Sequence, residues 1–120
     1  MENNQENTLL NRFQKLLSVS KPSNIKKVTP FIDYQESRKG NENYLIATII
    51  VKMETDYFYA DVPWLGDASS FATEEEKEAV KKEMTDYILE ILEGDLETDY
   101  LKNYWKDRDL RQEDWKRKGE

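Results

Sequence analysis

Neither cysteine nor histidine occurs in the 120 residues of this chain. The lack of cysteine excludes disulfides, thiolate metal sites and thiol nucleophiles. The lack of histidine removes the side chain that most often serves as a general base and as a transition-metal ligand. An enzyme of this composition would have to work with carboxylates, lysine and a metal such as magnesium.

Two patterns that such a metal enzyme or metal site would need are incomplete. Asp95-Leu-Glu97 opens like a calcium loop, but Tyr100 stands where that loop requires glycine. Glu75 and Lys77 loosely fit a metal-nuclease spacing, yet residues two apart on a helix do not face one another. Glycine-rich phosphate loops are also absent, because the four glycines are isolated in the sequence. We expect no enzymatic activity, no cofactor and no bound metal.

The chain also lacks a long hydrophobic run. Its longest apolar stretch, at 45–51, is interrupted by Thr48 and is far too short to cross a bilayer. The first eight residues are polar and contain no apolar signal region. We therefore expect a cytoplasmic protein that does not contact a membrane.

Acidic residues, in contrast, are abundant and concentrated in the middle of the chain. The formal net charge is −7, from 25 acidic and 18 basic residues. Positions 54–100 contain 15 acidic and 3 basic residues, whereas positions 1–53 have 8 basic and 5 acidic, and 101–120 have 7 and 5. This uneven distribution of charge produces an electric field that affects which partners bind and how fast they associate. It argues against nucleic acid as a direct ligand of the acidic part.

Hydrophobic periodicity predicts an antiparallel sheet of three strands in a single domain. Strict alternation of apolar residues indicates a central strand at 44–54, between strands at 25–37 and 57–64. Pro30 lacks an amide donor and places the first strand at a sheet edge. Residues 65–72 are expected to form a loop.

Helices are predicted before and after these strands. Leucines at helical spacing indicate a first helix that ends near Val19. Thr73 and Glu76 form a capping box for a second helix, which Gly94 should end before a third helix begins. The fold class is therefore α+β, in the order α-β-β-β-α-α. We expect a three-stranded meander with the helices mainly on one face, and frayed tails at 1–7 and 116–120.

The central strand has a second apolar face, formed by alternate residues: Tyr44, Ile46, Thr48, Ile50 and Lys52. A sheet covered on one side would leave this face uncovered. Either the terminal helices wrap around it, or it is an exposed interaction surface.

The second half of the acidic helix contains a row of carboxylates at helical spacing: Glu83, Asp86, Glu90, Glu93 and Glu97. Closer to its start, Glu74 with Lys77 and Glu78 with Lys82 have the spacing of ion pairs, but the row itself has no such partners. Like charges at this spacing are mildly destabilising. The row is either tolerated for solubility or retained for a basic partner.

Tyr57, Tyr59 and Asp61 alternate away from the apolar side of the third strand. Tyrosine beside aspartate is favoured at interaction hot spots. These three residues and the carboxylate row are therefore the candidate partner-binding residues.

In layout alone the chain is similar to several phage-encoded inhibitors of host defence nucleases, which occupy a nucleic-acid channel. The double-stranded-RNA-binding fold has a related element order. Its lysine-rich second helix corresponds to an acidic helix here, and this argues against RNA binding.

The leading hypothesis is a non-enzymatic, phage-encoded or mobile-element inhibitor, a DNA mimic that sets its carboxylates against the basic cleft of a host nuclease. The alternative is a structural, assembly or immunity accessory protein that acts through the apolar sheet face. A carboxylate-metal enzyme is the third hypothesis. Sequence leaves the oligomeric state open.

Overall fold

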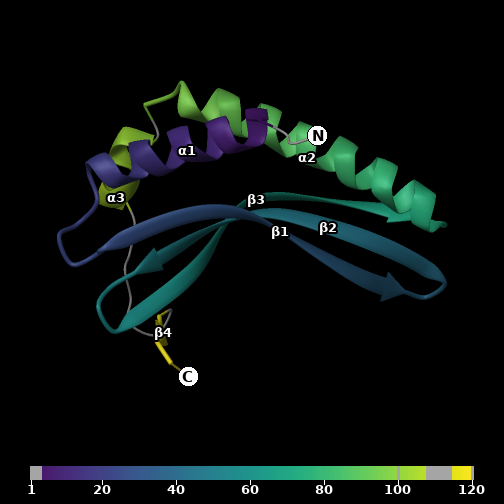
Figure 1. Ribbon diagram of the computed structural model, residues 1–120, viewed down its shortest axis with the longest axis horizontal. Helices are drawn as coiled ribbons and strands as arrows, with labels where there is room; N and C mark the ends of the chain where they lie inside the picture. Colours follow the sequence, from purple (N-terminus) through teal and green to yellow (C-terminus); the bar gives the residue numbers. More distant parts are fainter. Residues whose placement is uncertain (1–3, 100, 108–114, 120) are drawn as a thin grey trace.

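The computed structural model describes residues 4–99, 101–107 and 115–119 (Figure 1). Its elements follow in the order α1 (Asn4–Val19), β1 (Lys27–Lys39), β2 (Glu42–Glu54), β3 (Phe58–Phe71), α2 (Glu74–Leu96), the 3-10 turn η1 (Leu101–Asn103), α3 (Tyr104–Asp107) and β4 (Lys116–Arg117). The predicted α+β class is confirmed. The predicted three-stranded sheet is wrong, because β4 adds a fourth strand. In the described part of the chain, no helix is long and apolar enough to cross a membrane.

The strands form one antiparallel sheet in the order β1-β2-β3-β4. As predicted, β2 is central and β1, which contains Pro30, is an edge strand. Alternate residues of β2 are buried beneath the helices: Leu45, Ala47, Ile49, Val51 and Met53. Side chains alternate across a strand, so this face forms the sheet's half of the core.

The third strand is longer than predicted and includes most of the expected loop at 65–72. Leu65 pairs with Ile49, whereas Pro63 pairs with Ile50, so Trp64 is an extra residue in β3. Such a bulge reverses the alternation of faces beyond it. The polar run after Trp64 therefore resembles a loop in the sequence, although it continues the ladder to Phe71.

Both long helices lie on one face of the sheet, as predicted (Figure 1). Phe13 and Leu17 of α1 and Ile88 and Leu92 of α2 are fully buried in the shared core. The sheet curls away from the helices toward both ends, so its opposite face is concave (Figure 1). We call this opposite side the free face. Neither long helix wraps around it, which answers the question that the second apolar face of β2 raised.

The second helix begins at its predicted cap but ends later than predicted. The Thr73 hydroxyl accepts a hydrogen bond from the Glu76 amide at 3.1 Å, and the Glu76 carboxylate accepts one from the Ala72 amide at 3.3 Å. Gly94 was expected to stop the helix, yet α2 continues to Leu96. A single glycine weakens a helix without ending it when packing on either side holds the next turn in place.

Replacing Gly94 with alanine should therefore raise the free energy of unfolding by about 0.5–1 kcal/mol. Glycine costs about that much in a helix interior, and a Cβ added at this position meets no atom within 4 Å beyond the adjoining backbone of its own helix. Urea denaturation followed by circular dichroism measures the change. A loss of stability would show that Gly94 has a conformation that only glycine adopts.

Regular structure extends further into both predicted tails than expected, at residues 4–7 and 116–117. α1 begins at Asn4, inside the segment assigned to a frayed tail. At the other end, Lys116 and Arg117 pair with Tyr59 and Phe58, and the Lys118 amide donates to the Tyr57 carbonyl at 2.8 Å. Within residues 101–107, the expected third helix is present as η1 and the short α3.

Aromatic packing attaches the C-terminal segment to the core. The ring of Trp64 lies 4.9 Å from Phe13 and 5.1 Å from Tyr104, measured between centroids. Tyr104 packs edge-on against Trp105 at 5.2 Å, and the Trp105 indole donates to the Leu17 carbonyl at 2.8 Å. The bulge in β3 therefore has a structural role, because it supplies the tryptophan that joins α1 to α3.

Candidate functional site

All five predicted carboxylates of α2 are exposed in one row, which we call the α2 ladder: Glu83, Asp86, Glu90, Glu93 and Glu97. The first four lie within the helix, and Glu97 caps its end. Ion pairs in the described part of the chain involve Glu36, Glu54 and Glu74, and none involves the ladder. The ladder is therefore an uncompensated acidic stripe.

Two large apolar side chains emerge beside the ladder. Tyr87 is 53% exposed and Ile91 is 38% exposed. Their helical spacing with Val80, Met84, Ile88 and Leu92 predicts that both belong to the buried stripe of this helix, and this prediction is wrong. The buried face of α2 is rotated toward α1 and includes Thr85 and Leu89 instead, because this helix packs against α1 as well as the sheet. Tyr87 and Ile91 are then left in solvent, as interface anchors often are.

These two residues lie on the β3 side of the helix. Tyr87, Ile91 and Asp95 are spaced by four and share one face, and the Asp95 carboxylate accepts a hydrogen bond from the Trp64 indole at 3.3 Å. We call the ladder together with Tyr87 and Ile91 the α2 surface. It combines a row of charges with two apolar contacts on one rigid helix.

The start of α2 differs from the ladder because its charges are partly paired. Lys77 bridges Glu74 at 2.8 Å and Glu36 of β1 at 3.2 Å. The hydrogen bonds to Glu74 and then to Glu36 raise the pKa of Lys77. The second predicted pair, Glu78 with Lys82, does not form, although both residues are described.

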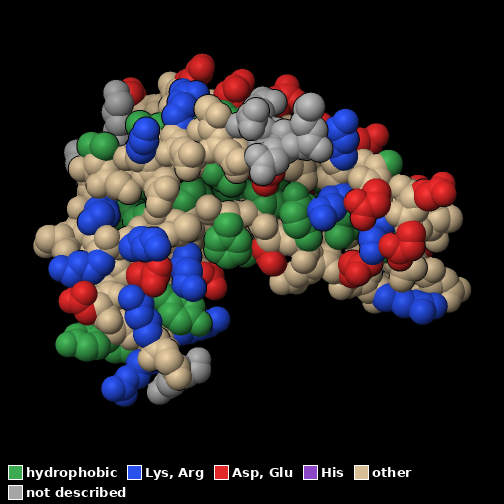
Figure 2. All heavy atoms as spheres, in the orientation of Figure 1, with side chains coloured by type: hydrophobic (Ala, Val, Ile, Leu, Met, Phe, Trp, Pro, Cys, Tyr) green, Lys and Arg blue, Asp and Glu red, His purple; other side chains and the backbone are tan. Residues whose placement is uncertain are grey.

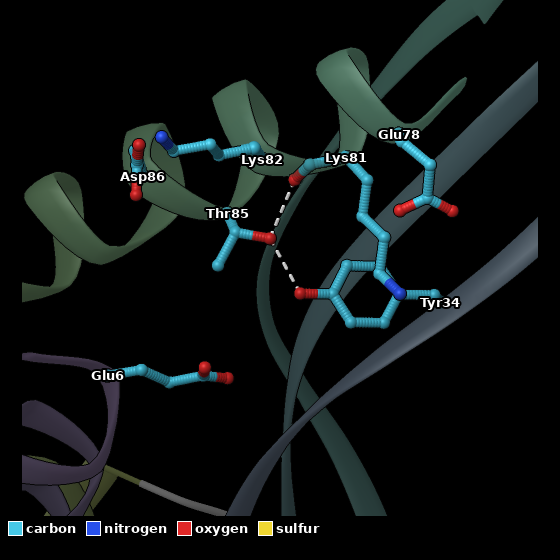
Figure 3. A pocket seen from close by; sticks show the side chains of 7 residues that line it. All are labelled: Glu6, Tyr34, Glu78, Lys81, Lys82, Thr85 and Asp86. Carbon is cyan, nitrogen blue, oxygen red and sulfur yellow. Dashed lines mark hydrogen bonds between the residues drawn. The ribbon is translucent and has the colours of Figure 1, made fainter. Parts of the chain in front are cut away.

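Glu78 and Lys82 instead line a cavity of about 470 Å³ between α1, α2 and β1 (Figure 3). Its other lining residues are Glu6, Tyr34, Lys81, Thr85 and Asp86. Thr85 donates to the Lys81 carbonyl at 2.7 Å, so in its 2.6 Å bond with Tyr34 the tyrosine is the donor. The Lys81 ammonium lies 4.6 Å from the centre of the Tyr34 ring.

This hydrogen-bonded chain gives the cavity a structural role. Burial raises the pKa of the Tyr34 phenol, and its hydrogen bond to Thr85 offsets only part of that effect. Tyr34 therefore stays protonated near neutral pH, and its proton is directed at Thr85. The contact joins β1 of the sheet to α2, the helix that packs on it. It does not supply an activated nucleophile or base.

Tyr57, Tyr59 and Asp61 lie on a different surface from the α2 ladder. Tyr57 is exposed in the turn between β2 and β3. Tyr59 and Asp61 alternate with the buried Ala60, so they project from the free face, opposite the helices. The sequence-based site therefore separates into two surfaces, one on each side of the sheet.

A basic cluster surrounds these tyrosines, and sequence analysis did not detect it. We call it the basic end: Lys27, Lys52, Lys116 and Lys118. Register places Lys27 opposite Glu54, which pairs with Tyr59, which pairs with Lys116, all in one row. The Lys52 ammonium lies 4.6 Å from the centre of the Tyr59 ring. Lys and Arg side chains gather at this lower end of the molecule, whereas carboxylates follow α2 along the top (Figure 2).

Three segments far apart in the sequence build this cluster, so no local pattern indicates it. The one available signal was the basic run at 116–118, which was assigned to a frayed tail. Within the described residues, no group of three or more carboxylates is arranged to hold a metal ion. The segment from Asp95 that resembles a calcium loop begins within the last turn of α2.

No family model, no curated protein and no solved structure matches this chain.

Proposed function

We propose that the protein is a non-enzymatic inhibitor that binds a basic protein through the α2 surface, as a DNA-mimic decoy of the kind that phages or mobile elements use against host defences. Its target would be the basic nucleic-acid-binding cleft of a host nuclease. The observation that carries this proposal is the uncompensated α2 ladder beside exposed Tyr87 and Ile91.

The charge density of the ladder supports this reading. From Glu83 to Glu97 the helix rises by about 20 Å, at about 1.5 Å per residue. One strand of DNA carries about six phosphates over that length, at about one per 3.4 Å. Five carboxylates on one face therefore come close to the charge of one strand. A cleft adapted to that charge would attract the helix at long range.

Tyr87 and Ile91 support the proposal in a second way. Charges at the rim of an interface mostly raise the association rate, whereas buried aromatic and aliphatic anchors slow dissociation. A decoy needs both, because it must outcompete nucleic acid already near the cleft. Tyr57, Tyr59 and Asp61, on the other face of the sheet, are not part of this surface.

Affinity capture with matched variants tests the proposal. The ladder variant is Glu83→Gln, Asp86→Asn, Glu90→Gln and Glu93→Gln. The control variant is Asp56→Asn, Asp61→Asn, Glu75→Gln and Glu78→Gln. Each removes four exposed carboxylates and changes the net charge from −7 to −3. Each immobilised protein is incubated with a bacterial lysate and washed at low and at high salt.

The ladder variant should capture about tenfold less of the basic partner than the wild type, because exposed charge pairs contribute a few tenths of a kcal/mol to about 1 kcal/mol each. The control variant should capture as much as the wild type. High salt should release the partner from the wild type and from the control variant. The captured protein should lose nucleic-acid binding when the inhibitor is added. Equal losses in both variants would mean that net charge, and not the α2 surface, determines capture.

One observation favours the alternative of a structural or assembly protein that acts through the sheet. Phe31 on the free face is 37% exposed, and it lies opposite Ile50, which in turn pairs with Pro63. These three residues form an apolar row across the concave side. A role in assembly needs this row to contact another chain.

A further inference from the structure

The free face of the sheet is a hollow with an apolar floor. Phe31, Ile50 and Pro63 form one cross-strand row on it, and Ile46 pairs with Ala68 two rows further along. Between these rows Thr48 pairs with Gly66, which has no side chain, and with Asp33 of β1, the one carboxylate that the described residues place in this part of the floor. The lower side of the molecule is visibly hollowed, with hydrophobic side chains beneath the sheet (Figure 2).

The basic end forms one rim of this hollow. Its four cations are near three carboxylates: Glu54, Asp56 and Asp61. Glu54 is already held by Lys118 at 3.3 Å, and Asp61 lies opposite Lys52 in the register. The rim therefore keeps a small positive excess, with Lys27 and Lys116 exposed at its edge.

A suitable occupant must be convex, must present apolar side chains to the floor and must carry negative charge toward the rim. The α2 surface of the same protein has all three properties. It is a helix on the convex side, it exposes Tyr87 and Ile91, and its ladder has no cation in an ion pair within the described chain. Complementary charge also disfavours wrong partners, because like charges in contact are costly.

We propose that the protein self-associates head to tail, with the α2 surface of one copy seated in the free-face hollow of the next. A symmetric contact between two free faces is disfavoured, because it leaves a void between two hollows. A head-to-tail contact uses two different surfaces and so can repeat from copy to copy. This inference rests on the proposed role of α2 as a binding surface, and it adds that self-association occupies α2 until a basic partner competes for it.

Two variants separate the two surfaces. The helix variant carries Tyr87→Gln, Glu90→Lys and Ile91→Gln. The hollow variant carries Lys27→Glu, Phe31→Gln and Lys116→Glu. All six side chains are exposed, so each variant should keep the wild-type circular dichroism spectrum and melting curve. Pro63→Glu, also exposed on the free face, replaces the hollow variant if that one unfolds.

Sedimentation equilibrium measures association, at protein concentrations up to about 1 mM because contacts of modest area are often weak. At about 20 mM salt the wild-type mean mass should rise with concentration above the 14.3 kDa of one chain, and at about 500 mM salt it should return to that value. Each variant alone should stay at one chain. An equimolar mixture should form a species of two chains and nothing larger, because one intact helix meets one intact hollow.

A wild type that stays monomeric at low salt would overturn the inference. So would a variant that still associates alone, or a mixture that stays monomeric while the wild type assembles. The proposed function is judged separately, by capture with the ladder variant. If the wild type is monomeric but still captures a basic partner, the proposal of self-association is wrong and the proposed function stands.

Discussion

Replacing Phe13 with alanine should lower the free energy of unfolding by about 3–5 kcal/mol, the usual cost of truncating a buried phenylalanine. Phe13 has no exposed surface, and its ring packs edge-on against Trp64 of β3. The cavity would lie where α1, the bulge and Tyr104 meet, so the surrounding side chains can relax little. Domains of this size have about 5–15 kcal/mol of stability. Urea denaturation followed by circular dichroism measures the loss.

Val19→Ala provides the control on the same helix. Val19 is 84% exposed at the end of α1, so its truncation should change stability by no more than about 0.5 kcal/mol. Similar losses in the two variants would mean that α1 does not pack on the sheet through Phe13.

Gly66→Ala should have the second-largest effect on stability, a loss of about 1–3 kcal/mol, the usual cost of overpacking. A Cβ at this position would lie 2.9 Å from the Ala47 carbonyl oxygen and 3.2 Å from the Thr48 hydroxyl. Ala47 is in the central strand, and its backbone cannot move without shifting the β2–β3 pairing. Denaturation is again the measurement.

The contrast with Gly94 isolates the cause of this effect. The same substitution fills open space in α2 but meets backbone in β3, so the two variants should change stability in opposite directions. The double variant Gly66→Ala, Thr48→Ala removes the hydroxyl contact and leaves the carbonyl contact. It should therefore recover only part of the loss. Full recovery would mean that the side chain of Thr48, and not the close approach of the strands, excludes Cβ.

The sheet was largely predictable from sequence because its central strand is apolar on both faces and alternates over its whole length. Pro30 likewise marked the edge strand through its missing donor. The extension of β3 was not predictable in the same way. A bulge at Trp64 reverses the alternation, and the polar residues after it resemble a loop until their pairing with β2 is known.

The acidic half of the candidate site was predictable, but its apolar half was not. Carboxylates at helical spacing indicated an exposed row on α2. Tyr87 and Ile91 were assigned to the core because periodicity alone does not show that α2 packs against two neighbours. The neighbouring helix widens and rotates the buried face, and these two residues become exposed.

The position of Tyr57, Tyr59 and Asp61 relative to α2 depends on tertiary structure. Alternation correctly placed Tyr59 and Asp61 away from the core face of β3, whereas Tyr57 lies in the turn before this strand. It did not show that the helices cover only the core face of the sheet. Because they do, the α2 ladder lies on one side of the sheet and Tyr59 and Asp61 lie on the other. The basic end depends even more on the fold, because β4 brings Lys116 to the row of Lys27 and Tyr59.

Carboxylate footprinting of the complex with the captured basic protein tests the central claim most directly. The free and bound proteins are labelled with a carbodiimide and an amine, and the labelled sites are quantified by mass spectrometry. Binding through the α2 surface predicts that Glu83, Asp86, Glu90 and Glu93 lose most of their labelling, while Asp56 and Glu75 keep theirs. Unchanged labelling along α2, with protection at Asp56 and Asp61 instead, would contradict the account and place the partner on the free face of the sheet.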